Sequence, residues 1–309
     1  MNKTVFMFSG QGAQYTGMGK DLCENFTVAN EVYEKASTLL GYDVLELSKT
    51  GTMEQISVTS VSQPLIYTLS MAAFEVLKSN GILPHAVAGF SLGECSALTA
   101  AGAMTLETGL TVIKERAAAM QKAAENASGA MYAILGAEQS DIEAICASTE
   151  GYVIPVNYNC PGQIVIAGEA ISAENAAKSL AEKGAKAIRL AVNSAFHSSM
   201  MQSASEEFFD KIKDFSFNAP NVPVYSNVTG GLLTSSNIPE YLRTQMISPV
   251  RFIDEMAAMN AGGYTRFIEL GPGKTLCGFI RKTLKGAEFA NVEDKKTLEK
   301  TLKSLEFKV

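Results

Sequence analysis

Apolar residues near the start of the chain form short β-rich runs that alternate with stretches of helical spacing. Residues 4–8 are a β-rich run that ends in a glycine turn, which predicts a buried strand. Apolar residues recur at helical spacing over residues 60–77 and predict a helix. The small residues 86–89 predict a second strand, and helical spacing resumes at once over residues 92–101. A strand, a tight turn and a helix therefore meet at Ser91.

The pattern changes to a closely spaced alternation of strands and helices between residues 129 and 190. Strands are expected at 130–135, 152–156, 163–167 and 185–190, and helices at 140–146 and 171–183. The order β-α-β-β-α-β is typical of a ferredoxin-like arrangement, and it interrupts a chain whose α/β character resumes after His197. Further strands are expected at 222–227 and 266–270.

These elements predict an α/β fold in two parts. We expect an α/β-hydrolase-like large catalytic domain formed by residues 1–126 and 194–309, with an inserted ferredoxin-like small domain at residues 127–193. A length of 309 residues suits one large core with a smaller module.

The composition describes a globular chain and excludes several classes of protein. With 47% apolar and 19% charged residues, the chain can bury a core and lacks the signature of disorder. A formal charge of −6 disfavours nonspecific nucleic-acid binding, which needs clustered Lys and Arg. No apolar run of about 18 residues is present, so no membrane span is expected. The residues before the first strand are too few for a signal peptide, so we expect a cytoplasmic protein.

The cysteines and histidines give no sign of a metal site or a disulfide framework. The five cysteines are odd in number and scattered, with no C-x-x-C, and only His85 and His197 could assist them. The segment that begins at Gly10 does not form a nucleotide loop, because the third glycine of G-x-G-x-x-G would fall at Tyr15. We therefore expect no metal and no bound cofactor.

Residues 89–93 (GFSLG) form a G-x-S-x-G sequence at the junction of a strand and a helix. The glycines allow a turn tight enough to expose the Ser91 hydroxyl, and the backbone N–H groups of such a turn can stabilise an oxyanion. The pattern is short enough to arise by chance, and a serine here could instead cap the helix that follows. It indicates a nucleophile only in its strand-turn-helix context.

A serine nucleophile needs a base, and the chain offers two histidines. His85 precedes the strand that leads to Ser91, so we expect it at the opposite end of that strand in a surface loop. His197 follows the small domain, where a loop that returns to the large domain could reach the cleft. A single histidine is usually a hydrogen-bonded structural residue, but the scarcity of histidines favours His197 as the base.

Arg116 lies on a helix that is expected from about Leu106 onward, beside a run of alanines. Its guanidinium could bind a planar anion such as a carboxylate. An arginine whose stem lies along the protein surface is an equally good interpretation of the sequence.

Several segments follow one another in an order that resembles the malonyl-CoA:acyl carrier protein transacylases. They are residues 8–14 (FSGQGAQ), 89–94 (GFSLGE), 116 with 120–121, 129–131 (GAM), 157–168 (NYNCPGQIVIAG), 195–197 (AFH), 223–229 (PVYSNVT) and 269–273 (ELGPG). The resemblance covers nearly the whole chain and favours a stand-alone bacterial enzyme over a domain of a larger synthase.

The resemblance implies that the protein moves a malonyl group from malonyl-CoA to the phosphopantetheine thiol of acyl carrier protein, in fatty acid or polyketide chain extension. The group would pass through a malonyl ester of Ser91, which matches the family's nucleophile, with His197 as the general base. Gln11 and Leu92 match the residues whose backbone N–H groups bind the oxyanion. Arg116 matches the arginine that pairs with the malonyl carboxylate.

Other positions follow from the same resemblance. Gln245 matches the residue whose main-chain carbonyl orients the catalytic histidine, in place of the aspartate of a triad. Gln63 and Asn159 match polar residues that line the cleft. Phe90 departs from the family, which usually has a histidine before the nucleophile. Because this position flanks the acyl pocket, the departure leaves the acyl selectivity open.

Three alternatives remain at this point. A serine hydrolase such as a thioesterase would use the same Ser91 and His197, but it usually places an acidic residue between them, and most candidates here fall in the small domain's helices. A second alternative is an acyltransferase with a broader acyl preference. A scaffold that only binds acyl carriers would be expected to have lost Ser91 or His197.

The carrier partner is expected to dock through acidic helices on a local basic patch of a monomeric enzyme. The candidate residues for this patch are Arg281, Lys282 and Lys285.

Overall fold

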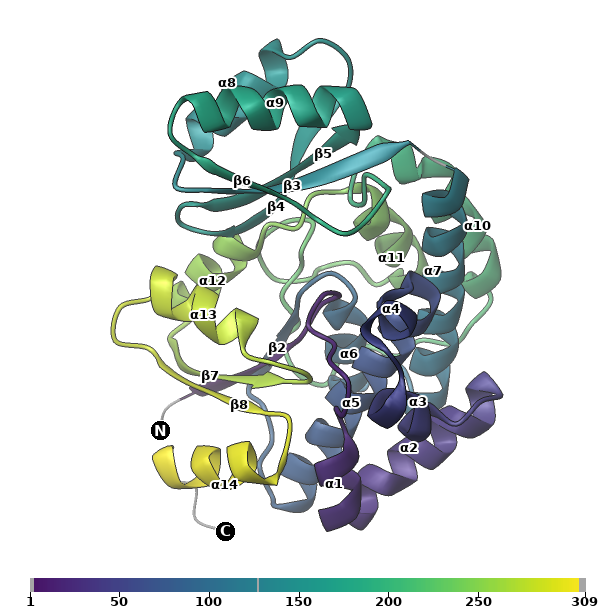
Figure 1. Ribbon diagram of the computed structural model, residues 1–309. Coiled ribbons are helices and arrows are strands. Elements are labelled where there is room, and N and C mark those ends of the chain that lie inside the picture. The colour runs from purple at the N-terminus through teal and green to yellow at the C-terminus, as the bar shows by residue number, and fades with distance from the viewer. Residues whose placement is uncertain (1–2, 127, 306–309) are drawn as a thin grey trace.

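The computed structural model describes residues 3–126 and 128–305 of the chain (Figure 1). Residues 1 and 2, residue 127 at the expected domain boundary, and residues 306–309 at the expected end of the large domain lie outside the described residues. In the described part, no helix is both long and apolar enough to cross a membrane.

A four-stranded parallel sheet organises most of the chain, with the strand order β2-β1-β7-β8. Its strands are β1 (Lys3–Phe8), β2 (Ala86–Gly89), β7 (Tyr264–Leu270) and β8 (Glu288–Val292). All three pairings are parallel, so the carboxyl ends of the strands meet at one edge. The predicted strands at 4–8, 86–89 and 266–270 are confirmed.

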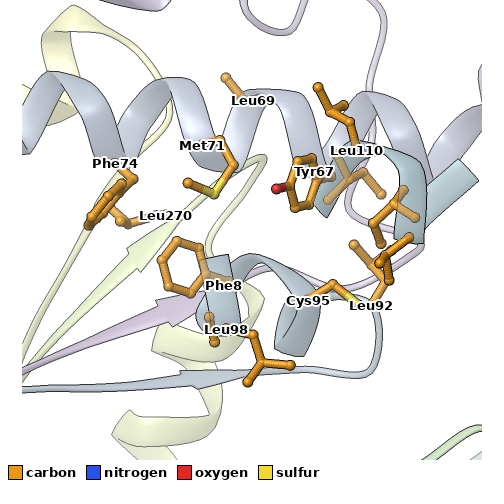
Figure 2. Close-up of a cluster of buried hydrophobic side chains, with 14 of the residues drawn as sticks. Phe8, Tyr67, Leu69, Met71, Phe74, Leu92, Cys95, Leu98, Leu110 and Leu270 are labelled. Atoms are coloured by element: carbon orange, nitrogen blue, oxygen red, sulfur yellow. The ribbon is translucent and has the colours of Figure 1, made fainter. Parts of the chain in front are cut away.

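Helices cover both faces of the parallel sheet, as the alternation of side chains along β1 requires. Phe6 and Phe8 pack on one face with α5 (Thr59–Ser79) and α6 (Gly93–Ala100), and Figure 2 shows Phe8 and Leu270 beneath α5. Val5 and Met7 pack on the other face in a cluster with α12 (Phe252–Ala261) and α13 (Thr275–Thr283). Residues 5–8 of this strand are therefore all apolar because both of its faces are buried.

Further helices form outside residues 129–189. They are α1 (Lys20–Asn25), α2 (Thr27–Leu40), α3 (Val44–Thr50), α4 (Met53–Ser57), α7 (Leu106–Asn126), α10 (Gln202–Ile212), α11 (Ile238–Ile247), α12 (Phe252–Ala261), α13 (Thr275–Thr283), α14 (Lys295–Ser304) and the short 3₁₀ helix at Ser199–Met201. The predicted helices around residues 60–77, 92–101 and from 106 onward are confirmed. The helices α1 to α4 and α10 to α14, and the strand β8, were not predicted.

A second, antiparallel sheet has the strand order β4-β5-β3-β6. Its strands are β3 (Gly129–Leu135), β4 (Val153–Cys160), β5 (Gln163–Glu169) and β6 (Lys186–Arg189), and its helices are α8 (Gln139–Ser148) and α9 (Ala170–Glu182). Figure 1 shows this sheet, with α8 and α9 above it, at the end of the molecule opposite α14. The elements follow one another in the predicted order.

The two faces of the antiparallel sheet are both apolar but pack on different partners. Ile134 and Ile166 belong to a separate cluster with residues of α8 and α9, such as Leu180. Met131 and Val165 point the other way and join the core that surrounds α5. The second sheet therefore has its own core and also rests on the main one.

The predicted strand at residues 222–227 is wrong. Only isolated bridges form there, from Val224 to Val87 and from Tyr225 to Leu232. Pro223 offers no N–H to a ladder, and its carbonyl accepts a single bond from Val87. The backbone N–H of Asn227 then turns to a buried carboxylate, Glu94, rather than to a neighbouring strand.

Candidate active site

The turn from β2 into α6 is too tight for side chains at its two glycines. A Cβ atom on Gly89 would lie 2.1 Å from the Gly93 carbonyl carbon, and one on Gly93 would lie 2.1 Å from the Phe8 carbonyl oxygen. Between them, Ser91 takes a φ of 54°, in the left-handed region. The N-cap of α6 is Leu92 and has no side-chain cap, so Ser91 is not a helix-capping serine. The turn instead presents the Ser91 hydroxyl to the side chains of His197 and Arg116.

Ser91 and His197 meet although they are 106 residues apart. The Ser91 Oγ lies 2.7 Å from His197 Nε2. His197 Nδ1 lies 3.1 Å from the Gln245 carbonyl oxygen and 3.2 Å from that of Ser248. Carbonyl oxygens only accept, so Nδ1 carries the ring proton and Nε2 is left to accept from the serine hydroxyl. Two carbonyls thus fix the tautomer that an aspartate fixes in a triad.

His197 is neutral in this setting. Burial, and to a lesser extent the nearby Arg116 charge, lowers its pKa to about 4. His85 is exposed just before β2, where its Nδ1 accepts a hydrogen bond of 3.1 Å from the Thr4 N–H. The expected separation of the two histidines is confirmed.

Arg116 is buried, with 1% of its surface exposed, so it is not a surface arginine. Its Nη1 donates to Gln63 Oε1 at 2.8 Å, and its Nη2 donates to Gln245 Oε1 at 3.1 Å and to Ser91 Oγ at 3.2 Å. Within residues 3–126 and 128–305, no carboxylate contacts this guanidinium and its Nε has no partner. Burial lowers the pKa of Arg116. Because its partners are neutral oxygens, this guanidinium can still bind the carboxylate of a ligand.

Gln63 connects Arg116 with the loop that follows β1. Its Nε2 donates to Gln11 Oε1 at 3.1 Å and lies 3.3 Å from the Met120 sulfur. Gln11 in turn donates from Nε2 to Thr59 Oγ1 at 3.1 Å. The carboxyl ends of β1 and β2 are adjacent, so this loop is held beside the Ser91 turn.

The backbone N–H groups near Ser91 divide into bonded and available donors. The Ser91 N–H donates to Asn227 Oδ1 at 2.7 Å, and the Gly93 N–H donates to the Phe90 carbonyl. The N–H groups of Gln11 and Leu92 have no acceptor in the described part of the chain. These two N–H groups are therefore available to a negatively charged oxygen beside Ser91.

In the described part of the chain, the Phe90 and Asn159 side chains do not join the hydrogen-bond network of Ser91. The Phe90 ring packs against Phe252 and Phe279, with centroid separations of 5.5 and 6.1 Å. Asn159 is buried near the end of β4, and its Oδ1 has no hydrogen-bond partner among the residues that the structure describes.

A second layer of buried polar residues was missed in the sequence. Glu94 lies beneath the turn and accepts from the Asn227 N–H at 2.9 Å, from Gln245 Nε2 at 2.8 Å and from the Tyr241 hydroxyl. Burial raises the pKa of Glu94 to about 7. A carboxylate within an otherwise small and apolar helix was the one signal that could have been read.

Residues 5–303 match the protein family described as the acyl transferase domain. The malonyl CoA-acyl carrier protein transacylase of Bacillus subtilis (strain 168) is 38% identical over 310 residues, which is 99% of this chain and 98% of the relative. The Escherichia coli (strain K12) enzyme of that name is 36% identical over 91% of this chain and 93% of its own length.

Solved structures agree with these relatives. The crystal structure of a malonyl CoA-acyl carrier protein transacylase from Clostridium perfringens has a TM-score of 0.94 at 41% identity, covering 98% of this chain and 97% of that one. A malonyl-transacylase in complex with its type II PKS acyl-carrier protein has a TM-score of 0.94 at 33% identity, covering 98% and 99%. The chain therefore belongs to the acyl transferase domain family, among its malonyl CoA-acyl carrier protein transacylases.

Proposed function

We propose that this protein transfers the malonyl group of malonyl-CoA to the phosphopantetheine thiol of acyl carrier protein, through a malonyl ester of Ser91. The reaction supplies chain extension in fatty acid or polyketide synthesis. One observation carries the assignment: the Ser91 Oγ lies within hydrogen-bond distance of both a neutral histidine and a buried guanidinium. Nucleophile, base and carboxylate receptor thus share one small site.

In the first half-reaction, His197 Nε2 takes the Ser91 proton as Oγ attacks the thioester carbonyl. The tetrahedral oxyanion is bound by the N–H groups of Gln11 and Leu92. Collapse of this intermediate breaks the carbon–sulfur bond, and the CoA thiolate leaves with the proton that His197 held. The products are free CoA and malonyl-Ser91.

In the second half-reaction, the same groups act in reverse. His197 takes the proton of the carrier's thiol, and the thiolate attacks the ester carbonyl of malonyl-Ser91. The serine oxygen leaves and recovers its proton from His197. Each step uses only side chains, backbone N–H groups and two thiols, so we propose no cofactor and no metal.

Arg116 supplies the selectivity for malonyl. A carboxylate one methylene away from the thioester carbonyl can reach the guanidinium while the carbonyl lies at Ser91. An acetyl group would leave this buried cation without an anion, at a cost of about 3–5 kcal/mol. We assign Gln63 and Asn159 to the cleft wall and Phe90 to the edge of the acyl pocket. The hydrogen bond from Arg116 to Gln63 and the burial of Asn159 support the first two positions.

The orientation of His197 argues against the hydrolase alternative. Two carbonyls, from Gln245 and Ser248, occupy the place where a triad hydrolase has an acidic side chain. We therefore assign the Gln245 carbonyl to orienting His197.

We also propose that residues 127–193 form a ferredoxin-like domain inserted into an α/β-hydrolase-like domain of residues 1–126 and 194–309. The strand order β4-β5-β3-β6 and the separate apolar cluster support this division. We propose that the enzyme is a cytoplasmic monomer.

The carrier is proposed to dock beside α13. Arg281 and Lys282 are exposed in the last turn of this helix, and Lys285 is exposed just after it. Phe279 of the same helix packs against Phe90, next to the nucleophile. This contact between α13 and the residue before the nucleophile supports the proposed docking position.

Charge reversal of all three basic residues to Glu tests this docking surface. We expect the KM for the carrier to rise about tenfold or more, because an acidic partner loses its steering contacts. The rate of Ser91 acylation by malonyl-CoA is expected to stay unchanged. Unaltered kinetics with the carrier would remove this patch from consideration.

Mass spectrometry of the intact protein tests the function as a whole. After incubation with malonyl-CoA, we expect a single malonyl adduct on Ser91 that disappears when phosphopantetheinylated carrier is added and reappears on the carrier. Acetyl-CoA should give little adduct. Rapid release of free malonate without transfer would instead identify a hydrolase.

A further inference from the structure

Asn227 is a fully buried residue that the proposed reaction does not use directly. Its Oδ1 accepts from the Ser91 N–H at 2.7 Å, and its Nδ2 donates to the Gly89 carbonyl at 2.6 Å and to Glu255 Oε1 at 2.8 Å. One side chain thus joins both ends of the turn that carries the nucleophile.

The two ends of this turn make opposite demands on the side chain that holds them. The Ser91 N–H requires an acceptor, whereas the Gly89 carbonyl requires a donor. A planar amide offers both at a fixed separation. An aspartate would instead turn an oxygen toward the Gly89 carbonyl and toward Glu255, and a leucine would leave both backbone groups buried without partners.

We call the two hydrogen bonds from the Asn227 side chain to the Ser91 N–H and the Gly89 carbonyl the clamp. The clamp matters because the Ser91 backbone is strained. Its φ of 54° lies in the left-handed region, which is unfavourable for a residue other than glycine. Without the two hydrogen bonds to Asn227, the turn is free to relax, and the Ser91 Oγ moves away from His197. The same clamp occupies the Ser91 N–H, so the oxyanion must be bound by the next N–H, that of Leu92.

Asn227 is itself held from below by a buried cluster. Its backbone N–H donates to Glu94, which also accepts from Gln245 Nε2. Tyr241 donates to Glu94, and its hydroxyl lies 2.8 Å from Ser226 Oγ. Since Gln245 presents its carbonyl to His197, the Glu94 carboxylate links the residue that holds the nucleophile with the one that holds the base.

We propose that Asn227 is a positioning residue that fixes the Ser91 Oγ relative to His197, and that Glu94 and Tyr241 hold Asn227 in register with Gln245. This inference rests on the proposed acylation of Ser91. It assigns a role in alignment and none in substrate binding, so it predicts a loss in the rate of acylation with little change in affinity for malonyl-CoA.

Rapid-mixing measurement of the acylation burst tests the proposal. Asn227→Leu is close in shape to asparagine and removes the clamp, and Tyr241→Phe removes only the hydroxyl beneath it. Asn260→Leu is the matched control, at an exposed position of α12. We expect the burst rate of Asn227→Leu to fall about a hundredfold, as for a misplaced reacting group, with a full amplitude of about one malonyl per chain. The KM for malonyl-CoA should change less than about threefold.

Tyr241→Phe is expected to lose about three- to tenfold in burst rate, and Asn260→Leu to match the wild type. A wild-type rate in folded Asn227→Leu, or a reduced amplitude at wild-type rate, would overturn the proposal, the latter because it indicates a smaller folded fraction. Should Asn227→Leu fail to fold, a wild-type burst rate in Tyr241→Phe overturns it instead. Absence of any burst in the wild type would count against the proposed function rather than against this clamp.

Discussion

The two sheets of this protein differ sharply in what they bury. Around the parallel sheet, the buried side chains include charged or titratable groups such as Glu94, Arg116, His197 and Glu255. Among the described residues 129–189, the buried polar side chains are Asn157, Asn159 and Ser172, and all are uncharged. The region around the parallel sheet therefore buries charged and titratable groups at a cost in stability, whereas the region around the antiparallel sheet is an ordinary apolar core.

The difference shows that the stability lost by burying titratable groups is concentrated around the parallel sheet. Burial raises the pKa of Glu94 and Glu255 and lowers that of His197 and Arg116, so each charged form is disfavoured relative to water. Such groups persist only where a hydrogen-bond network holds them. We therefore expect substitutions near the parallel sheet's edge to act on chemistry, and those in the second core to act on stability.

The largest expected effect is that of Ser91→Ala. Formation of the malonyl adduct and transfer to the carrier should both fall to the background level, because the variant removes the hydroxyl that lies 2.7 Å from His197 Nε2. Intact-protein mass spectrometry after incubation with malonyl-CoA provides the measurement. An adduct of unchanged amount would show that the nucleophile lies elsewhere. The buried polar groups around the parallel sheet would then not serve the reaction of Ser91.

Arg116→Ala should reduce kcat/KM for malonyl transfer by about a thousandfold, because a carboxylate loses its buried partner. Acetyl transfer should be preserved or improved, since the variant removes a cation that acetyl leaves unpaired. Arg116→Lys is the matched charge-preserving control and should not restore malonyl transfer. Parallel losses for both acyl groups would make Arg116 a structural residue.

His197→Ala should lower the acylation rate by about a hundredfold or more, whereas His85→Ala should leave it unchanged. The pKa of His197 is lowered to about 4, so the neutral base is present above that pH. We expect kcat/KM for acylation to rise as the pH increases through about 4 and then to stay level up to neutral pH. A midpoint near 6.5 would contradict the burial and the charge of Arg116 as causes.

A malonyl carboxylate bound to Arg116 should offset the guanidinium charge that helps to lower the pKa of His197. The low-pH limb of kcat, which reports the enzyme–substrate complex, should therefore lie at higher pH than the limb of kcat/KM. Acetyl-CoA, which lacks the carboxylate, should show no such separation. Comparing the pH profiles for malonyl-CoA with those for acetyl-CoA thus separates the effect of a bound carboxylate from that of a neutral acyl group.

The smallest expected effect on chemistry is that of Ile166→Ala in the second core. Ile166 is fully buried between the sheet and its helices, so the free energy of unfolding should fall by about 2–4 kcal/mol. The acylation rate of the folded protein should change less than about twofold. Ile171→Ala, at a position of α9 that is 76% exposed, is the matched control and should alter stability by less than about 0.5 kcal/mol. A large catalytic loss in Ile166→Ala would erase the contrast between the regions.

The sequence predicted the parts of the molecule that local spacing determines. The strands that flank the nucleophile, the tight turn at Ser91 and the element order around the second sheet all follow from apolar periodicity and glycine placement. The strand prediction for residues 222–227 was wrong although the segment has the expected alternation of apolar residues. Pro223 and the inward turn at Asn227 prevent a ladder of hydrogen bonds there. At these two residues, the available hydrogen-bond partners determine the backbone conformation more than the hydrophobic pattern does.

Contacts between distant segments could not be read from the sequence. The burial of Arg116 depends on partners from α5 and α11, and the clamp on Ser91 comes from Asn227, 136 residues away. The family resemblance supplied roles for Arg116 and Gln245, but it offered none for Asn227. Only the folded arrangement reveals that a single amide spans the Ser91 turn.

Among the described residues, Ser91 and His197 are the ones other than glycine that have a positive φ, at 54° and 63°. Replacing the partly exposed Ser91 by glycine would relieve about 1–2 kcal/mol of backbone strain and would remove the reaction with it. At the buried His197, glycine would instead leave a cavity and two carbonyls without their donor, so strain relief would not compensate there. An evolution experiment that selects only for heat resistance therefore endangers Ser91 before His197, and it needs a requirement for turnover in every round.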